Sequence, residues 1–337
     1  MSQPDRNTVA AAGKENAQRD SVVSARAPRG WTELFIHGVR LVILYAILRP
    51  IVMLPYRLQL GVGRLLGRIS YALARKPRWI ARCNIAACFP ELTPEERERL
   101  VHRHFDALGM SGIEMAFAWW GSERRLRART DVVGLENVAA AVASGRGIVL
   151  LTAHFTTMEL CGVALSMRVP HIHAVYRSFD KNPIADDMAR AGRMRWAEGL
   201  IERDNVMEMV RALRAKKPLW FASDQLVRPD KRSVIVPFFG VPCVVHGAIV
   251  DMVRMTDALV VPVVPLRLPD ATYKIEILPA LEAFPSDDRD ADLARLMSLF
   301  EGHIRIDPAQ YMWVWKRFSK RPPEYPDIYR RDTGASE

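Results

Sequence analysis

The sequence of 337 residues has few cysteines, and their spacing excludes two kinds of site. No two of the four cysteines form a Cys-x-x-Cys pair, so we expect neither a disulfide framework nor a cysteine-based zinc site, and the cysteine usage favours a reducing compartment. His171 and His173 could offer two metal ligands, but alternation at the start of a strand explains their spacing and no further ligands cluster with them. We therefore expect no metal site.

Clustered basic motifs are also lacking, although the chain carries 48 Lys and Arg against 38 Asp and Glu, a net charge of +10. This charge suits a polyanionic partner such as nucleic acid, anionic lipid or an acidic carrier protein. The basic residues are dispersed and no known nucleic-acid-binding module is present, so we expect no nucleic acid partner.

Long hydrophobic runs are scarce as well. The one membrane-like run, residues 41–48, lies between Arg40 and Arg49 and is shorter than the about 20 residues that span a bilayer. We expect residues 31–56 to form a membrane anchor or an interfacial helix, with a buried helix of the main domain as the alternative. Basic residues follow this segment, which favours a cytoplasmic main body. They are Arg57, Arg64, Arg68, Arg75, Lys76, Arg78 and Arg82.

The ends of the chain differ in composition from its centre. Residues 1–30 are polar and poor in large apolar side chains, which predicts a disordered tail, and they lack the apolar core of a signal peptide. Residues 57–322 form the expected main domain, and 323–337 a C-terminal tail. The stretch 61–67 (GVGRLLG) resembles a dinucleotide-binding fingerprint, but its spacing is wrong and no strand precedes it, so we reject that site.

The main domain alternates short apolar runs with helical patterns, which predicts an α/β fold with a mostly parallel central sheet flanked by helices. A capped helix should begin at Pro94 and run towards Gly109. The expected strands are 148–153, 172–176, 219–222, 260–265 and 273–278. The expected helices between them are 157–168, 183–197, 204–215 and 246–257.

The first of these strands carries the strongest indication of catalysis. It delivers His154 to its carboxyl end, where open parallel sheets bind ligands, and Glu159 follows in the first turn of the next helix. From that turn Glu159 can reach back to His154, hold the imidazole in one tautomer and stabilise its protonated form, as a general base requires. The alternative is an ordinary strand-end histidine beside a helix carboxylate.

Six segments in order resemble the late acyltransferases of lipid A biosynthesis, the lauroyl and myristoyl type of Gram-negative bacteria. They are HFTTMEL (154–160), VYRSFDKNP (175–183), GRMRW (192–196), LWFASDQ (219–225), SVIVPFFG (233–240) and YMWVWKRF (311–318). The resemblance covers roughly residues 35–325. Thr156, Thr157 and Met158 stand where many relatives have Gly-Asn-Trp, so acyl length and attachment position stay open.

The resemblance implies a lipid A biosynthesis acyltransferase at the cytoplasmic face of the inner membrane. Acyl carrier protein presents a thioester as co-substrate, and the acyl chain goes to the 3-hydroxyl of an acyl chain on a Kdo-bearing lipid A precursor. His154 acts as general base oriented by Glu159, without an acyl-enzyme, and no cofactor is expected. Anionic inner-membrane lipids are a further expected partner.

Three arginines are expected to bind substrate. Arg177 follows a strand and suits an acceptor phosphate or the developing oxyanion, with a surface ion pair to Asp180 as the alternative. Arg193 and Arg195 could hold a phosphate or a Kdo carboxylate, or belong to a solvated helix face.

Four other residues complete the expected site. Asp224 and Gln225 end a strand and should face the same crevice, where Asp224 could bind a sugar hydroxyl, brace a basic residue or be structural. Phe238 and Phe239 could form an apolar wall, with the next residue, a glycine, permitting a tight turn, although burial alone would explain both aromatics. The Trp119–Trp120 pair fits core packing or an interfacial belt equally well.

Two other functions remain open from the sequence. The same chemistry could serve a lysophospholipid, an ornithine lipid or another glycolipid as acceptor. The chain could also be a membrane-associated binding or scaffold protein in which His154 and Glu159 are structural.

Overall fold

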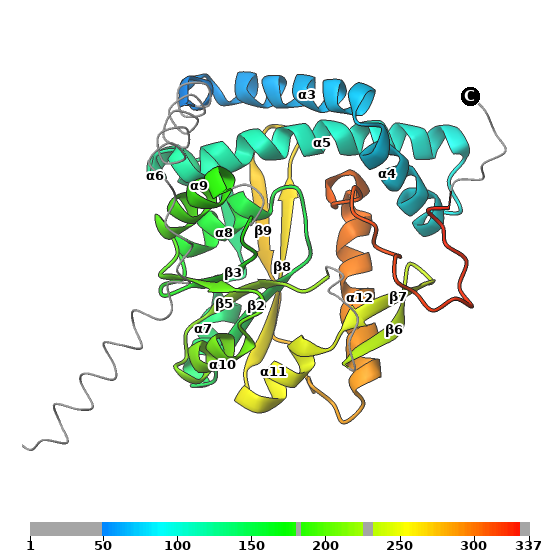
Figure 1. Ribbon diagram of the computed structural model, residues 1–337. Coiled ribbons are helices and arrows are strands. Elements are labelled where there is room, and N and C mark those ends of the chain that lie inside the picture. The colour runs from blue at the N-terminus through cyan, green and yellow to red at the C-terminus, as the bar shows by residue number, and fades with distance from the viewer. Residues whose placement is uncertain (1–48, 180–182, 225–231, 331–337) are drawn as a thin grey trace, which may run out of the picture. The chain divides into compact units, whose positions relative to one another are not determined.

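The computed structural model describes residues 49–179, 183–224 and 232–330 (Figure 1). The predicted tail 1–30, residues 31–48 of the predicted anchor, Gln225 and Asp180 lie outside these ranges. Within them, no helix combines the length and the hydropathy that crossing a bilayer would need.

A seven-stranded sheet forms the centre of the fold, with the strand order β1-β9-β8-β2-β5-β3-β4. All neighbours pair in parallel except β8 and β9, so the predicted α/β fold with a mostly parallel sheet is confirmed. The strands are β1 (Thr130–Val133), β2 (Ile148–Thr152), β3 (His173–Tyr176), β4 (Gly199–Glu202), β5 (Leu219–Ala222), β8 (Leu259–Arg267) and β9 (Tyr273–Ile277).

Helices surround this sheet (Figure 1). Those before β2 are α3 (Tyr56–Leu73), α4 (Arg75–Cys88), α5 (Pro94–Trp120), α6 (Glu123–Arg127) and α7 (Leu135–Ala143). Those after β2 are α8 (Met158–Ser166), α9 (Pro183–Met194), α10 (Val206–Arg214), α11 (Ala248–Thr256), α12 (Arg289–Ile306) and the 3-10 helix Pro308–Gln310.

The central strand β2 is buried on both faces. Its residues Val149 and Leu151 pack in one apolar cluster with side chains of α10, α11 and α12. Ile148 and Leu150 point the other way, into a second cluster with side chains of α7 and α8. Successive side chains of β2 thus enter two different apolar clusters. Both faces of the strand need apolar residues, and the sequence of this segment is therefore a continuous apolar run.

The five strands and four helices predicted from the main domain are confirmed to within a few residues. Strands β1 and β4 are not among the expected strands; they lie at the two edges of the sheet, are four residues long and are only partly buried. The hairpin of β6 (Ser233–Phe238) and β7 (Val241–His246) is also not among the expected elements. Phe239 and Gly240 form its turn, both at positive φ, so the expected tight turn at the glycine is confirmed.

The first part of the expected C-terminal tail packs on the domain. Tyr329 is buried, and its hydroxyl hydrogen-bonds the side chain of Asn84 at 2.5 Å and the backbone N–H of Phe318 at 3.0 Å. These bonds tie the end of the described chain to α4.

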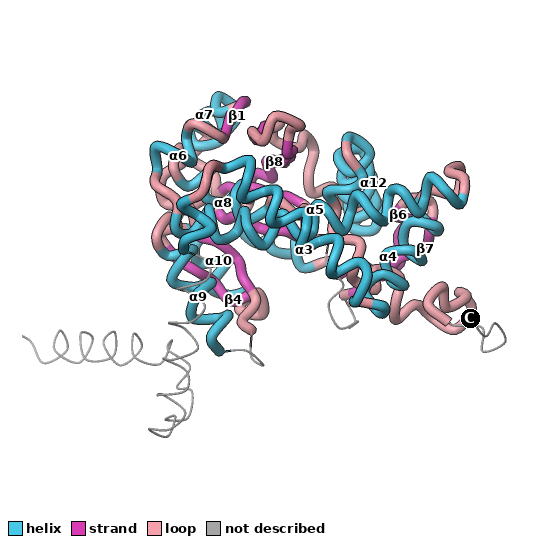
Figure 2. The backbone as a smooth tube through the Cα atoms, turned by 90° about the horizontal axis from the view of Figure 1, so that it is seen from above, coloured by secondary structure: helices cyan, strands magenta, loops and turns pink. Residues whose placement is uncertain are grey.

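Helix α5 begins where predicted but is longer. Thr93 and Glu96 form a reciprocal capping box at its start. The helix continues past Gly109 to Trp120, and Gly109 lies where the backbones of α3 and α5, which run side by side, meet (Figure 1, Figure 2).

Glycines make this close approach of α3 and α5 possible. A Cβ on Gly67 would lie 2.1 Å from the carbonyl oxygen of Phe105, and a Cβ on Gly109 would lie 2.1 Å from that of Gly63. Two of the three glycines of the rejected fingerprint, Gly63 and Gly67, therefore serve helix packing, because backbone meets backbone where no side chain fits.

We expect Gly67→Ala to lower the free energy of unfolding by about 2 kcal/mol or more, since the neighbouring atoms are backbone and cannot move aside. Gly61→Ala, on the same helix, is the matched control, because nothing lies within 4 Å of its Cβ position. It should be neutral or stabilising by up to about 1 kcal/mol. Chemical unfolding followed by circular dichroism measures both, and equal effects would show that the glycines do not set the contact.

Candidate active site

The segment after β2 places His154 in a loop fixed by the C-terminal part of the chain. Thr156 donates its backbone N–H to the carbonyl of Gln310 at 2.8 Å, and Met312 donates to the carbonyl of His154 at 3.0 Å. Phe155 forms a β-bridge with Tyr311 between these bonds. The backbone around His154 is thus held by a segment more than 150 residues away in the sequence.

Asp224 is the carboxylate that holds the imidazole. Because β5 is the parallel neighbour of β2, the two strands end side by side, with Thr152 paired to Ala222. The Nδ1 atom of His154 lies 2.5 Å from Oδ1 of Asp224, and the backbone N–H of His154 donates to the same oxygen at 3.0 Å. The hydroxyl of Tyr311 donates to Oδ2 at 2.8 Å.

These contacts fix the charge of Asp224. Burial alone would raise the pKa of this carboxyl, but the charge and hydrogen bonds of His154 outweigh burial and hold the pKa at about 2. Burial and the neighbouring Asp224 raise the pKa of Tyr311 well above its usual value, so its hydroxyl stays a donor. An ionised carboxylate only accepts hydrogen bonds, so Nδ1 of His154 carries a hydrogen, and in the neutral imidazole the lone pair is therefore on Nε2.

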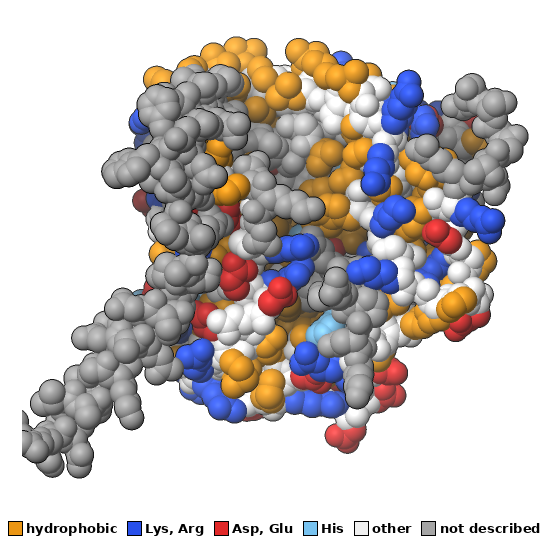
Figure 3. All heavy atoms as spheres, in the orientation of Figure 1, with side chains coloured by type: hydrophobic (Ala, Val, Ile, Leu, Met, Phe, Trp, Pro, Cys, Tyr) orange, Lys and Arg blue, Asp and Glu red, His pale blue; other side chains and the backbone are white. Residues whose placement is uncertain are grey.

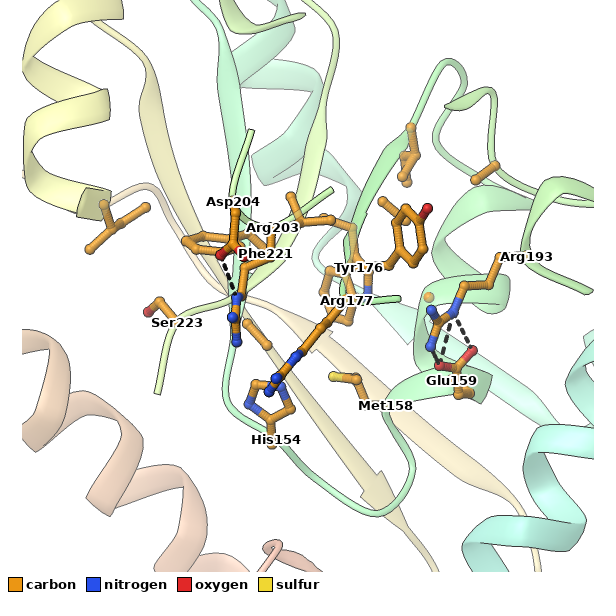
Figure 4. Close-up of a pocket in the computed structure, with 18 of the residues that line it drawn as sticks. His154, Met158, Glu159, Tyr176, Arg177, Arg193, Arg203, Asp204, Phe221 and Ser223 are labelled. Carbon is orange, nitrogen blue, oxygen red and sulfur yellow. Dashed lines mark hydrogen bonds and ion pairs between the residues drawn. The ribbon is translucent and has the colours of Figure 1, made fainter. Parts of the chain in front are cut away.

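Glu159 does not make the expected contact with His154. It lies in the first turn of α8 and receives Nε of Arg193 at 3.1 Å on each carboxylate oxygen, with a closer contact from Nη2. The indole N–H of Trp119 adds a bond of 3.2 Å. Figure 4 shows Glu159 and Arg193 facing each other at a distance from the His154 ring. The partner expected for His154 is therefore corrected from Glu159 to Asp224.

Arg193 and Arg195 lie in different surroundings. Arg193 is mostly buried and lines the cavity, and although burial alone would lower its pKa, Glu159 raises it. Arg195 instead donates to the carbonyl of Trp119 at 2.9 Å, at the end of α5. Arg193 therefore does not belong to a solvated helix face, whereas Arg195 is exposed and lies just after the end of α9.

Trp119 is a core residue at the same junction. Its side chain is buried, and a Cβ on Gly192 of α9 would lie 2.2 Å from its ring. Helices α5, α8 and α9 therefore meet around one indole.

Phe238 and Phe239 do not line the cavity. Both are buried in an aromatic cluster, with Phe238 6.0 Å from the ring of Tyr311 and Phe239 6.2 Å from that of Trp313. The expected apolar wall is thus replaced by core packing that supports Tyr311.

A cavity of about 350 Å³ opens beside His154. One part of its wall is apolar and comes from α8, β3, β5 and α11, and a Cβ on Gly162 would lie 3.1 Å from the indole nitrogen of Trp220. The polar part includes Arg177, whose guanidinium points to the His154 ring (Figure 4). The apolar lining residues are Met158, Gly162, Val163, Ile172, Ala174, Val175, Ala197, Val206, Trp220, Phe221, Ala222, Ala248 and Ile249.

Several residues of the site are not apparent from the sequence. Tyr311 and Trp315 lie in a quoted motif, yet no spacing connects them to His154; Trp315 meets its ring edge to face at 5.0 Å. Arg203, which is paired with Asp204 of the same cavity wall, and Arg232 also line the cavity. In the described part of the chain, no group of three His, Cys, Asp or Glu side chains could hold a metal ion.

Comparisons with known proteins identify the family. A family model described as bacterial lipid A biosynthesis acyltransferase matches residues 31–320. The chain belongs to this family. The resemblance seen in the motifs is confirmed, and the protein is an acyltransferase.

The relatives in the family differ in the acyl chain that they are named for. A lipid A biosynthesis lauroyltransferase of Escherichia coli K12 is 34% identical over 281 residues, 83% of this chain and 91% of the relative. The palmitoleoyltransferase of the same strain is 32% identical over 305 residues, 90% of this chain and 95% of the relative. Its myristoyltransferase is 24% identical over 269 residues, 79% and 82% respectively. Family membership therefore does not fix the acyl length.

We expect Asp224 to contribute to acid unfolding. Its pKa of about 2 in the folded protein lies below that of an unfolded aspartate, so its contribution is present above about pH 4 and lost as the pH falls towards 2. In Asp224→Asn, the fall in unfolding free energy between pH 5 and pH 3 should be smaller than in wild type by roughly 1 to 2 kcal/mol. Urea unfolding across this range measures it. The exposed Asp287→Asn is the control, and an Asp224→Asn slope equal to wild type would contradict the charge assignment.

Proposed function

We propose that the protein transfers a fatty acyl chain from acyl carrier protein to the 3-hydroxyl of an acyl chain on a Kdo-bearing lipid A precursor. The observation that carries this proposal is a histidine fixed by a buried carboxylate at the wall of a largely apolar cavity. A base beside an apolar cavity suits a reaction in which a hydroxyl attacks a thioester that carries a long acyl chain.

The chemistry follows from the tautomer. Nε2 of His154 takes the proton of the acceptor hydroxyl as its oxygen attacks the thioester carbonyl. The tetrahedral intermediate then collapses, the carbon–sulfur bond breaks, and the imidazolium returns the proton to the departing thiolate. Asp224 keeps Nδ1 protonated throughout and stabilises the imidazolium between the two proton transfers.

We propose direct transfer without an acyl-enzyme. Burial raises the pKa of the Cys161 and Cys243 thiols, which makes both poor nucleophiles. Ser223 lines the cavity, but the adjacent Asp224 is already engaged by His154 and Tyr311 and is not bonded to the serine hydroxyl. Ser223→Ala should therefore retain transfer activity.

Arg177 is the proposed electrostatic partner of the reacting carbonyl. Its guanidinium points to the imidazole, so a carbonyl bound beside Nε2 would lie within its reach (Figure 4). Donors fixed where negative charge develops stabilise the transition state more than the substrate. A phosphate of the acceptor is the other anion that this group suits.

The Glu159–Arg193 pair has a proposed positioning role. It joins α8 to α9 across the cavity wall, so it sets the width of the apolar part. In this proposal Asp224 orients His154, and Glu159 helps to shape the site that binds the acyl chain.

The proposed partners follow from charge and from the family. A net charge of +10 suits an acidic carrier protein, a phosphorylated acceptor and anionic inner-membrane lipids. We place the catalytic domain at the cytoplasmic face of the inner membrane, where acyl carrier protein is available, and the proposed reaction requires no cofactor.

The two carboxylates can be distinguished by kinetics. Asp224→Asn should lower kcat by about 10³ to 10⁴, because the amide permits the wrong imidazole tautomer. Glu159→Gln should cause a markedly smaller loss, since it leaves the His154–Asp224 bond in place. Both variants are assayed with a purified Kdo-bearing precursor as acceptor and with acyl carrier protein that carries acyl chains of defined length. The products are identified by mass spectrometry.

Asp287→Asn serves as the surface control, and circular dichroism verifies that each variant is folded. A folded Asp224→Asn enzyme with near wild-type kcat, together with an inactive Glu159→Gln, would return the orienting role to Glu159. Wild-type protein that acylates a lysophospholipid but not the Kdo-bearing precursor would overturn the proposed acceptor.

A further inference from the structure

The outer face of α3 concentrates exposed hydrophobic side chains. Among the described residues, fifteen large hydrophobic side chains are exposed, and seven of them lie between Met53 and Leu73. The seven are Met53, Leu54, Leu58, Leu65, Leu66, Ile69 and Leu73. Figure 3 shows hydrophobic side chains gathered along the edge of the molecule that α3 forms in Figure 1.

Helical geometry sorts the side chains of α3 into three stripes. At 100° per residue, Arg57, Arg64 and Arg68 fall within an arc of about 40°, next to the exposed apolar stripe. The exposed leucines and Ile69 fall within an arc of about 100°. The third stripe is the buried face with Gly63 and Gly67, which packs on α5.

The buried stripe holds α3 in a fixed orientation. Besides the glycine contacts, Gln59 donates to the carbonyls of Val52 and Leu54, each at 2.8 Å, and the Tyr56 hydroxyl bonds that of Tyr273 at 2.6 Å. The apolar stripe is therefore presented to the outside by a helix that is fastened along its opposite side.

We propose that α3 is a membrane-contact surface in its own right, which lies in the headgroup region of an anionic bilayer with its apolar stripe towards the acyl chains. The inference rests on the membrane location proposed above. It adds a specific surface of the folded domain to the predicted anchor at 31–56.

Four features favour a bilayer over a protein partner. Helix α3 contains no Asp or Glu, and its apolar stripe is leucine and isoleucine without a pocket or an exposed aromatic anchor. Its basic stripe adjoins the apolar stripe, the arrangement of helices that lie in anionic membrane interfaces. The apolar run 41–48 also ends eight residues before α3, so chain of similar character leads directly into it.

Fluorescence quenching tests this contact in the full chain. In a Cys83→Ser background, Leu66→Cys or Leu73→Cys carries an environment-sensitive dye, and vesicles contain phosphatidylglycerol with brominated acyl chains. Quenching at both positions should exceed that at the control by about twofold or more. The control is Met207→Cys on α10, a hydrophobic position far along the chain whose exposed fraction of 62% lies between those of Leu66 (49%) and Leu73 (76%).

The basic stripe gives a second, independent readout. Replacing Arg57, Arg64 and Arg68 by Gln should lower the equilibrium constant for binding of α3 to anionic vesicles by up to about 100-fold. Quenching by anionic vesicles should fall accordingly, whereas quenching by zwitterionic vesicles should not change. A matched variant with Arg124, Arg211 and Arg214 replaced by Gln removes the same charge from exposed positions on α6 and α10 and should behave as wild type.

Equal quenching at Leu66 and Met207 would overturn the proposal. The proposal would also be overturned if the dye at Leu66 reported an apolar environment before vesicles were added and did not respond to them. In that case other parts of the chain or a second copy would cover the apolar stripe. The readout is fluorescence, so failure of docking is distinguishable from failure of acyl transfer.

Discussion

Asp224 has 1% of its side chain exposed, and a charged carboxylate is stable at that depth only when donors surround it. The imidazole and backbone N–H of His154 and the hydroxyl of Tyr311 are those donors. Three segments must converge: the end of β2 supplies His154 with two of the donors, the end of β5 carries Asp224 itself, and the segment after the 3-10 helix supplies Tyr311. The sheet register sets the first two, and the bridge between Phe155 and Tyr311 sets the third. The charge of one aspartate thus depends on the whole fold, and the tautomer of His154 depends on that charge.

Hydrophobic periodicity predicted the fold because β2, β5 and β8 are buried on both faces and read as uninterrupted apolar runs. Edge strands of four residues lack that pattern, so β1 and β4 were not predicted. The same reasoning found His154 and brought Asp224 to the crevice, since both follow parallel strands. It could not pair them, because the choice between Asp224 and Glu159 depends on which strand neighbours β2 and on Arg193 capturing the nearer carboxylate. Neither fact is local in sequence.

The role of the glycines of α3 also depends on a contact that is not local in the sequence. Their spacing does not match a dinucleotide fingerprint, and only the contact with α5 shows that Gly63 and Gly67 serve helix packing. By letting two backbones touch, they fix α3 and turn its leucines outward. Packing at one face of this helix therefore determines the surface at the other, and it links the stability of the domain to the membrane contact proposed for it.

Determining the tautomer of His154 is the most direct test of whether the charge of Asp224 controls it. Nitrogen-15 NMR of histidine-labelled protein at alkaline pH, assigned with His154→Ala, reports which ring nitrogen carries hydrogen. We predict hydrogen at Nδ1 in wild type and in Glu159→Gln, and its loss or exchange between the two nitrogens in Asp224→Asn. Hydrogen at Nε2 in wild type, or a change caused by Glu159→Gln but not by Asp224→Asn, would contradict the central role of Asp224.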